Sequence, residues 1–147
     1  MLKKYNIAVI GATGAVGQVL LDLIEERNFP YDSLHLCASS RSVGKKIIVN
    51  GNEYVVEEIN EELFNNIDFV FISANNEISK NIGLLASKKN CIVIDDSSVF
   101  RMNPDVPLVV PEVNPHALKN HKGIISIPNC STTPLAMVLK PLNSINP

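Results

Sequence analysis

This sequence lacks several features that are typical of membrane proteins, nucleic-acid-binding proteins and disulfide-rich proteins. It has no tryptophan and only eight other aromatic residues, and no apolar run approaches the roughly 20 residues that span a bilayer. Thirteen Lys and Arg stand against fifteen Asp and Glu, without a long run of one sign. This balance does not indicate a nucleic-acid surface or a basic membrane patch. The glycine-rich start does not read as a signal peptide, and we expect a cytoplasmic protein with small-molecule partners.

Cysteine is also scarce. Cys37, Cys91 and Cys130 are odd in number and far apart, which argues against a disulfide framework or a zinc site, and no metal site is predicted. Cys37 and Cys91 lie in apolar, strand-like runs and are expected to be inert core residues. Cys130 differs, because an extended apolar segment there gives way to a helical pattern. Unpaired N–H groups at a helix start favour a thiolate, so Cys130 is a candidate nucleophile.

What is present is an alternation of short β-type runs with helical stretches. Strands are predicted at 6–10, 34–38, 69–73, 91–95 and 124–127, helices at 16–26, 78–88 and 133–143, and a hairpin at 46–49 and 54–57. The hairpin turns through Asn50-Gly51, and the first helix has one apolar face with Val16, Leu20, Leu23 and Ile24. Residues 97–114 are predicted to be mostly loop. Near-continuous apolar strands predict an α/β, Rossmann-like domain over 1–147, with a mostly parallel sheet and helices on both faces.

A glycine-rich turn, Gly11-Ala12-Thr13-Gly14-Ala15-Val16-Gly17, directly follows the first predicted strand and opens the first helix. This spacing permits a tight turn, close approach of backbone to a pyrophosphate and close packing of helix on sheet. In its strand-turn-helix context the motif predicts a dinucleotide site. The predicted cofactor-binding residues in this turn are Gly11, Thr13, Gly14, Ala15, Val16 and Gly17.

The end of the second predicted strand should meet the adenosine ribose, where a carboxylate would favour NAD. Here the sequence reads Ala38-Ser39-Ser40-Arg41-Ser42, without a carboxylate. Hydroxyl groups and a guanidinium can bind a 2′-phosphate through charge-assisted hydrogen bonds. We therefore predict that Ser39, Ser40, Arg41 and Ser42 bind NADP. With a nicotinamide cofactor, the Cys130 thiolate can add to an aldehyde or acyl carbon and form an adduct that exchanges hydride with it.

Five stretches together resemble aspartate-semialdehyde dehydrogenase, and they follow that family's order over nearly the whole chain. They are Gly11–Gly17, Ala38–Lys45, Asp95–Met102, Val109–Asn114 and Ile127–Thr132. The Phe-Arg-Met and Asn-Cys-Ser-Thr motifs are the specific ones. The sequence departs from the family's pattern at two places: Asn75-Asn76 stands where the family commonly has glycines, and Asp96 stands where it commonly has asparagine.

The resemblance implies NADPH-dependent reduction of β-aspartyl phosphate to aspartate semialdehyde, with release of phosphate, on the route to lysine, methionine and threonine. It implies that Cys130 is acylated during turnover, that Arg101 binds the phosphate or acyl-phosphate group, and that Asn129 shapes the site around the thiol. Ser73 and Ala74 would line the nicotinamide or pyrophosphate side of the cofactor.

Members of the family are longer, and full-length ones are expected to form homodimers or homotetramers. Their second domain supplies a catalytic histidine, which His35, His116 and His121 do not match. The chain is therefore expected to be the cofactor-binding part and to have negligible turnover alone. Two alternatives stay open. An enzyme resembling N-acetyl-gamma-glutamyl-phosphate reductase shares the chemistry, although its cysteine usually lies in a Gly-Cys-Tyr-Pro setting, and a non-catalytic NADP-binding module would use the glycine turn alone.

Overall fold

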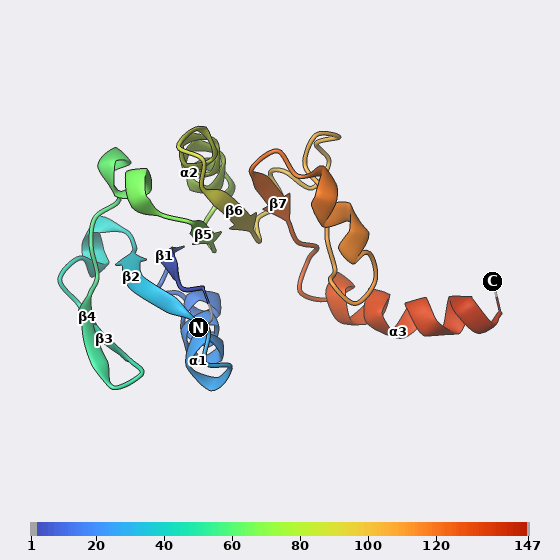
Figure 1. Ribbon diagram of the computed structural model, residues 1–147, viewed down its shortest axis with the longest axis horizontal. Coiled ribbons are helices and arrows are strands. Elements are labelled where there is room, and N and C mark those ends of the chain that lie inside the picture. Colours follow the sequence, from blue (N-terminus) through green and yellow to red (C-terminus); the bar gives the residue numbers. More distant parts are fainter. Residues whose placement is uncertain (1–2, 147) are drawn as a thin grey trace.

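A five-stranded, wholly parallel sheet forms the centre of the computed structural model, which describes residues 3–146 (Figure 1). The strands lie in the order β2-β1-β5-β6-β7. Their bounds are β1 Tyr5–Ile10, β2 Tyr31–Cys37, β5 Phe69–Ile72, β6 Ile92–Asp95 and β7 Ile124–Ser126. The chain leaves β1 towards β2 on one side and returns to β5 on the other. This is the switch point at which open α/β sheets bind nucleotides, and it confirms the Rossmann-like prediction.

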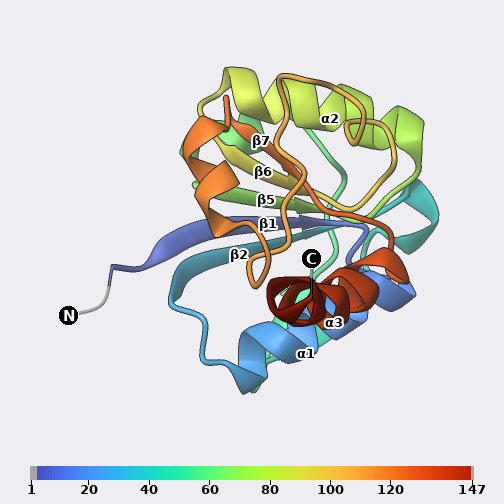
Figure 2. The same cartoon turned by 90° about the vertical axis from the view of Figure 1, so that its right-hand side faces the viewer.

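Helices α1, Ala15–Glu26, and α2, Asn76–Lys88, cover opposite faces of the sheet (Figure 2). The third helix, α3, Thr132–Ile145, extends away from the sheet and buries none of its residues (Figure 1). A separate antiparallel hairpin consists of β3, Lys46–Val49, and β4, Asn52–Val55. The φ angles of Asn50 and Gly51 are 50° and 73°, as a type I′ turn requires, so the predicted turn is confirmed. The second strand of the hairpin begins two residues earlier than predicted.

Two hydrophobic layers hold the sheet between the helices. Alternate residues of β1 point to opposite faces, so Ile7 and Val9 join the layer under α1 while Ala8 and Ile10 join the layer under α2. Cys37 and Cys91 are fully buried, as predicted for core thiols. Burial on both faces explains why the strands read as nearly continuous apolar runs.

The apolar face predicted for α1 differs in part from its buried face. Leu21 and Ile24 are buried with Gly17, whereas Val16 is 57% exposed. Val16 and Leu20 border an open pocket over β5 and β6, and only Leu20 of the two also packs against the layer under α1. Helical spacing identifies an apolar stripe, but the crossing of the helix over the sheet decides which part of the stripe is covered.

An apolar cavity remains over β6 and β7 on the side of α1. Ile92, Ile94 and Ile125 line a cavity of about 400 Å³ there, together with Val109 and Leu118. Helices therefore lie on both faces, as predicted, but α1 does not extend over these strands. None of the helices among residues 3–146 is long and apolar enough to cross a membrane.

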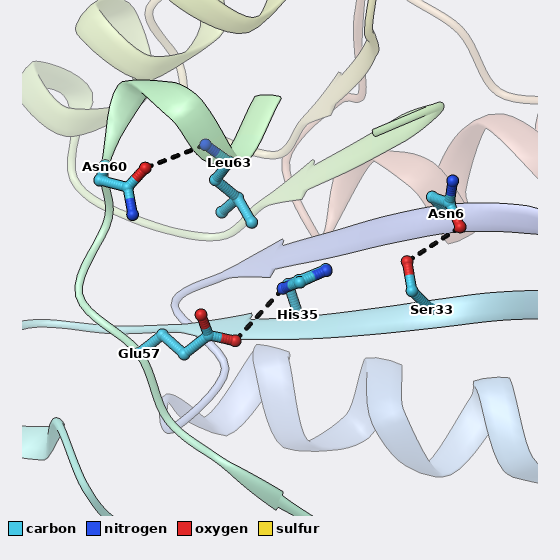
Figure 3. A network of polar contacts seen from close by, with 6 residues as sticks. All are labelled: Asn6, Ser33, His35, Glu57, Asn60 and Leu63. Atoms are coloured by element: carbon cyan, nitrogen blue, oxygen red, sulfur yellow. Dashed lines mark hydrogen bonds and ion pairs between the residues drawn. The ribbon is translucent and has the colours of Figure 1, made fainter. Parts of the chain in front are cut away.

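Figure 3 shows three polar contacts, of which two join β2 to neighbouring segments and the third caps a short helix. Ser33 Oγ donates to Asn6 Oδ1 at 2.9 Å, and His35 Nδ1 lies 3.2 Å from Glu57 Oε1. Asn60 Oδ1 accepts from the Leu63 N–H at 2.9 Å and so caps the short 3-10 helix Glu61–Asn66. This helix and two further 3-10 turns, Ser40–Ser42 and Pro115–Asn120, were not predicted, because they are too short to show a period.

Candidate functional site

The residues predicted to bind a cofactor or substrate follow the carboxyl ends of the strands. Since all five strands are parallel, these ends share one edge of the sheet. The glycine turn follows β1, the Ser-Arg turn follows β2, and Ser73-Ala74 follows β5. Arg101 comes after β6, and Cys130 after β7. The topology thus brings segments that are up to 119 residues apart in the sequence, Gly11 to Cys130, to a single edge.

The glycine turn is shaped by close backbone contacts. Gly11 has φ +90°, and its N–H donates to the Cys37 carbonyl oxygen at 2.8 Å. A Cβ atom at Gly11 would overlap the carbonyl oxygen of Ser73, and one at Gly17 would overlap the carbonyl oxygen of Gly11. Gly14 is the N-cap of α1 and has no side chain with which to cap the first turn. The turn therefore presents N–H groups that can receive a phosphate, and the residues fit a dinucleotide.

The Ser-Arg turn lies beside the glycine turn. Thr13 Oγ1 donates to Ser42 Oγ at 3.3 Å and joins the two turns. Ser39, Ser40 and Arg41 are exposed, whereas Ser42 is buried. Ser42 therefore differs from the other predicted cofactor-binding residues, because its hydroxyl is engaged in holding the two turns together. A pocket of about 80 Å³ next to these turns is lined by Ile10, Gly11, Ala38, Ser39, Ile59, Ala74 and Ile78.

Ser73 connects the glycine turn to a second pocket. Its N–H donates to the Ile10 carbonyl oxygen at 2.9 Å, which continues the β1–β5 pairing past the end of the strand. The second pocket, about 220 Å³, lies over β5 and β6 on the α1 face, and its lining includes Val16, Ser73, Asp96 and Ile127. Ser73 and Ala74 thus line different pockets on the two sides of the switch point.

Arg101 is held by backbone rather than by a carboxylate. Its Nη2 donates to the Asp96 carbonyl oxygen, 2.6 Å away, and its Nε donates to the Ile127 carbonyl oxygen at 3.0 Å. The side chain is half-buried and so ties the segment after β6 to the segment after β7. A guanidinium has five N–H donors, so these two bonds leave others to bind an anion.

Cys130 lies two residues before the first residue of α3, near the helix start at which the sequence predicts it. Its side chain is exposed, and its Sγ lies 3.5 Å from Asn129 Oδ1, to which it can donate a hydrogen bond. Asn129 Oδ1 also accepts from the N–H and the Oγ of Ser131 at 3.0 and 2.9 Å. The amide of Asn129 therefore organises the turn that presents the thiol.

The other two thiols, those of Cys37 and Cys91, are buried and have low reactivity. Burial raises the pKa of the Cys37 thiol to about 12, and the negative charge of Glu57 acts in the same direction. Burial also raises the pKa of the Cys91 thiol, whose Sγ donates to the Phe64 carbonyl oxygen at 3.3 Å. Thiolate is the reactive form, so exposure singles out Cys130 among the three.

Two polar residues near this edge were missed by the sequence reasoning. Asp95, the last residue of β6, is fully buried, and its Oδ2 accepts from Ser97 Oγ at 2.7 Å. Asn76, at the start of α2, donates from Nδ2 to Ser98 Oγ at 3.0 Å and accepts from the Ser98 N–H at 3.3 Å. A carboxylate directly after an apolar strand was the available signal for Asp95. No local pattern could pair Asn76 with Ser98, which lies 22 residues away.

Comparison with known proteins gives a consistent result. The family model for the semialdehyde dehydrogenase NAD-binding domain matches residues 6–121. An aspartate-semialdehyde dehydrogenase from Rickettsia bellii is 49% identical over 146 residues, which cover 98% of this chain and 43% of the relative. The chain thus spans less than half the length of this curated relative.

Solved structures show the same likeness. Aspartate semialdehyde dehydrogenase II from Vibrio cholerae, 41% identical, superposes with TM-scores of 0.94 in one crystal structure and 0.91 in another that is complexed with ASA. These matches cover 97% of this chain and 43% and 47% of the solved chains. The Candida albicans enzyme with NADP is 31% identical, with a TM-score of 0.80 over 95% of this chain and 47% of that chain.

Proposed function

Because the chain belongs to the family of semialdehyde dehydrogenase NAD-binding domains, we propose that it is the cofactor-binding part of an NADP-dependent aspartate-semialdehyde dehydrogenase. The whole enzyme would reduce β-aspartyl phosphate to aspartate semialdehyde and release phosphate, in the synthesis of lysine, methionine and threonine. The observation that carries the proposal is the tie between Arg101 and Ile127. It connects an anion-binding side chain to the segment that leads, three residues later, to the exposed thiol of Cys130.

The cofactor assignment rests on two neighbouring turns. The N–H groups at the start of α1 would receive the pyrophosphate, with Gly11, Thr13, Gly14, Ala15, Val16 and Gly17 forming the turn around it. Ser39, Ser40 and Arg41 are exposed beside it and would bind the 2′-phosphate that distinguishes NADP from NAD. Ser42 would act by fixing Thr13. Ser73 and Ala74 would line the cofactor from the two sides of the switch point.

Cys130 would act as the nucleophile. Its thiolate attacks the acyl carbon of the acyl phosphate, the carbon–oxygen bond to phosphate breaks, and phosphate leaves with that bond's electron pair. A thioester remains on Sγ. NADPH held by the two turns would supply the hydride that reduces this thioester. The oxyanion left on the former carbonyl carbon would then re-form a carbonyl group, so that the carbon–sulfur bond breaks, its electron pair returns to sulfur and the aldehyde leaves.

Arg101 would bind the substrate near the thiol, and Asn129 would shape the turn that carries the thiol. The N–H donors of Arg101 that are not bound to Asp96 and Ile127 would bind the phosphate or acyl-phosphate group. Asn129 would keep the Ser131 turn in the shape that exposes Cys130. Asp96 brings a carboxyl group to the edge of the same pocket, and we expect it to weaken anion binding there.

The remaining length of the relatives would complete the enzyme. The apolar cavity over β6 and β7 supports this view, because a parallel sheet is normally covered on both faces. The exposed apolar side chains of α3, among them Leu135, Leu139 and Leu142, support it as well. A general acid and base supplied by that second part would contribute about 10²–10⁴-fold to the rate. Assembly into homodimers or homotetramers would belong to the complete enzyme.

A reconstituted enzyme tests the proposal. Residues 1–147 are joined to the part of the Rickettsia bellii relative that follows its match, and phosphate-dependent NADP reduction is measured with aspartate semialdehyde. We expect turnover from the chimera, none from its Cys130→Ser variant, and negligible turnover from the 147-residue chain alone. A folded chimera that binds NADPH but is inactive would favour a non-catalytic module. Rates from the chain alone that equal those of the chimera would contradict the need for a second part.

A further inference from the structure

Asp95 is a buried carboxyl group for which the proposed chemistry has no use. It ends β6 with a side chain that is 0% exposed, and it is followed directly by the segment that leads to Arg101. Its Oδ2 accepts from Ser97 Oγ at 2.7 Å, whereas its Oδ1 has no hydrogen-bond partner among the described residues. Burying a carboxyl group costs free energy, so its short contact with Ser97 is the place to look for its role. Ser79 of α2, which is also fully buried, contributes a second hydrogen bond that lowers the pKa of the same carboxyl group.

The contact with Ser97 anchors a tight turn. Ser97 is itself 8% exposed, and its Oγ accepts from the Val99 N–H at 3.3 Å. The next residue, Phe100, is buried against α2, where its ring lies 3.0 Å from the position of a Cβ atom on Gly83. Two contacts therefore hold the turn: the hydrogen bond from Ser97 to Asp95 and the packing of Phe100 against α2.

Arg101 is the next residue after this anchored turn. Its N–H lies 3.4 Å from the Ser98 carbonyl oxygen, and its guanidinium reaches back to the carbonyl oxygen of Asp96 and across to that of Ile127. The direction of the guanidinium thus depends on the path of the turn between Asp96 and Arg101. Loss of the Ser97 anchor would free that path without removing any donor of Arg101.

We propose that Asp95 is a positioning residue that fixes, through Ser97, the direction in which the Arg101 guanidinium is presented at the carboxyl edge of the sheet. The inference rests on the proposed function in one respect, namely that Arg101 binds the phosphate group. Asp95 touches neither substrate nor cofactor. Its effect should appear in the binding of phosphate and leave the binding of NADP unchanged.

The main test uses Ser97→Ala in the active chimera, because this change removes the anchoring hydroxyl from the loop and leaves the buried carboxyl in place. We expect the KM for phosphate to rise, at most by roughly tenfold, because binding must then restore the order in the turn that one hydrogen bond had supplied. The KM for NADP should be unchanged. Ser33→Ala is the matched control, because Ser33 also donates to a side-chain oxygen but lies at the β2 edge. An unchanged KM for phosphate in Ser97→Ala would overturn the proposal.

Asp95 itself is tested with a pair of variants. Asp95→Asn keeps an oxygen that can accept from Ser97 and should preserve the KM for phosphate, whereas Asp95→Ala should raise it as Ser97→Ala does. If Asp95→Ala does not fold, Ser97→Ala still decides. Equal effects of the Asn and Ala variants on the KM for phosphate, with Ser97→Ala silent, would show that Asp95 has only a structural role.

A second measurement does not depend on activity. The Arg101 Nε–H, assigned by its loss in Arg101→Lys, should exchange slowly with solvent in NMR spectra because it donates to Ile127. Ser97→Ala should accelerate this exchange, and Ser33→Ala should not. Slow exchange in Ser97→Ala would overturn the positioning role. An inactive chimera with accelerated exchange in Ser97→Ala would instead contradict the proposed function and leave the positioning role supported.

Discussion

Arg101 donates its Nε–H to the carbonyl oxygen of Ile127 at 3.0 Å, so the arginine after β6 is bonded to the backbone that leads out of β7 towards Cys130. Two motifs 26 residues apart in the sequence are therefore joined by a hydrogen bond. If Arg101 binds the phosphate group as proposed, this geometry holds it in place beforehand and would reduce the entropy lost on binding.

Gly17→Ala should destabilise the chain, because its Cβ atom would overlap the Gly11 carbonyl oxygen, which belongs to backbone and cannot rotate away. We expect a loss of about 1–3 kcal/mol in the free energy of unfolding, as for other overpacked sites. Urea denaturation measures it. Gly14→Ala is the comparison, because its Cβ atom would lie 3.2 Å from the same oxygen and requires a smaller shift. Equal losses in the two variants would show that this close approach does not govern stability.

Arg41→Ala should weaken NADPH binding by tenfold or more, on the order of one charge-assisted hydrogen bond, and leave NADH binding nearly unchanged. Fluorescence titration of the chain with each reduced cofactor gives both dissociation constants. Arg27→Ala serves as the matched control, since Arg27 is exposed at the far end of α1. If Arg41→Ala weakens the two cofactors equally, the 2′-phosphate is bound elsewhere.

Iodoacetamide should label Cys130 in the folded chain and leave Cys37 and Cys91 unmodified. Cys130 is exposed, whereas the two other thiols are buried and have raised pKa values, that of Cys37 being about 12. Peptide mass spectrometry identifies the labelled residue, and Cys130→Ser provides the control for background labelling. All three cysteines should react in urea. Preferential labelling of Cys37 or Cys91 without urea would contradict the burial described here.

Asp95 should make the free energy of unfolding depend on pH. Burial raises the pKa of its carboxyl group in the folded chain, and hydrogen bonds from Ser97 and Ser79 oppose this shift only in part. The negative charge of Asp96 acts in the same direction as burial. The folded state then binds more protons than the unfolded state, whose carboxyl has a pKa of about 3.9. The stability that this proton provides is complete below that value and is lost as the pH rises through the raised pKa.

The difference between the wild-type chain and Asp95→Asn isolates this effect, because asparagine does not titrate. Urea denaturation at a series of pH values upward from about 4 should show the wild type losing stability relative to Asp95→Asn, in the sense given by proton linkage. Asp68→Asn is the control. Asp68 is also an aspartate next to a strand of the sheet, but it accepts from the Asn6 N–H at the end of the sheet where the strands begin. A wild-type advantage that grows with rising pH would contradict the assigned direction of the shift.

Much of the architecture could be predicted from local patterns. The five strands of the sheet, the three helices and the Asn50-Gly51 turn follow from periodicity and from the few residues that accept positive φ angles. Boundaries differ by one to three residues, as for the second strand, which begins at Tyr31 and not at 34. The short 3-10 helices could not be predicted from the sequence, because three to six residues do not complete enough turns to show a helical hydrophobic period.

For the candidate site, too, some features could be predicted from the sequence and others could not. Gly11–Gly17, Arg41 and Cys130 could be selected from their places in the sequence. The glycine turn directly follows β1, Arg41 lies in the turn after β2, and Cys130 lies between β7 and α3. The engagement of Ser42 with Thr13, the bonds of Arg101 to Asp96 and Ile127, and the exposure of Val16 could not be predicted. They depend on how distant elements pack against one another.

By itself, then, the sequence determined the order and type of the main elements, the glycine turn and the position of the thiol before a helix, because these depend on sterics and periodicity over a few neighbouring residues. Only the tertiary structure decided which face of α1 is covered, that Asp95 is buried, and that Arg101 joins β6 to β7. Those features arise where segments far apart in the chain exclude water from one another, and no short stretch of sequence contains both partners.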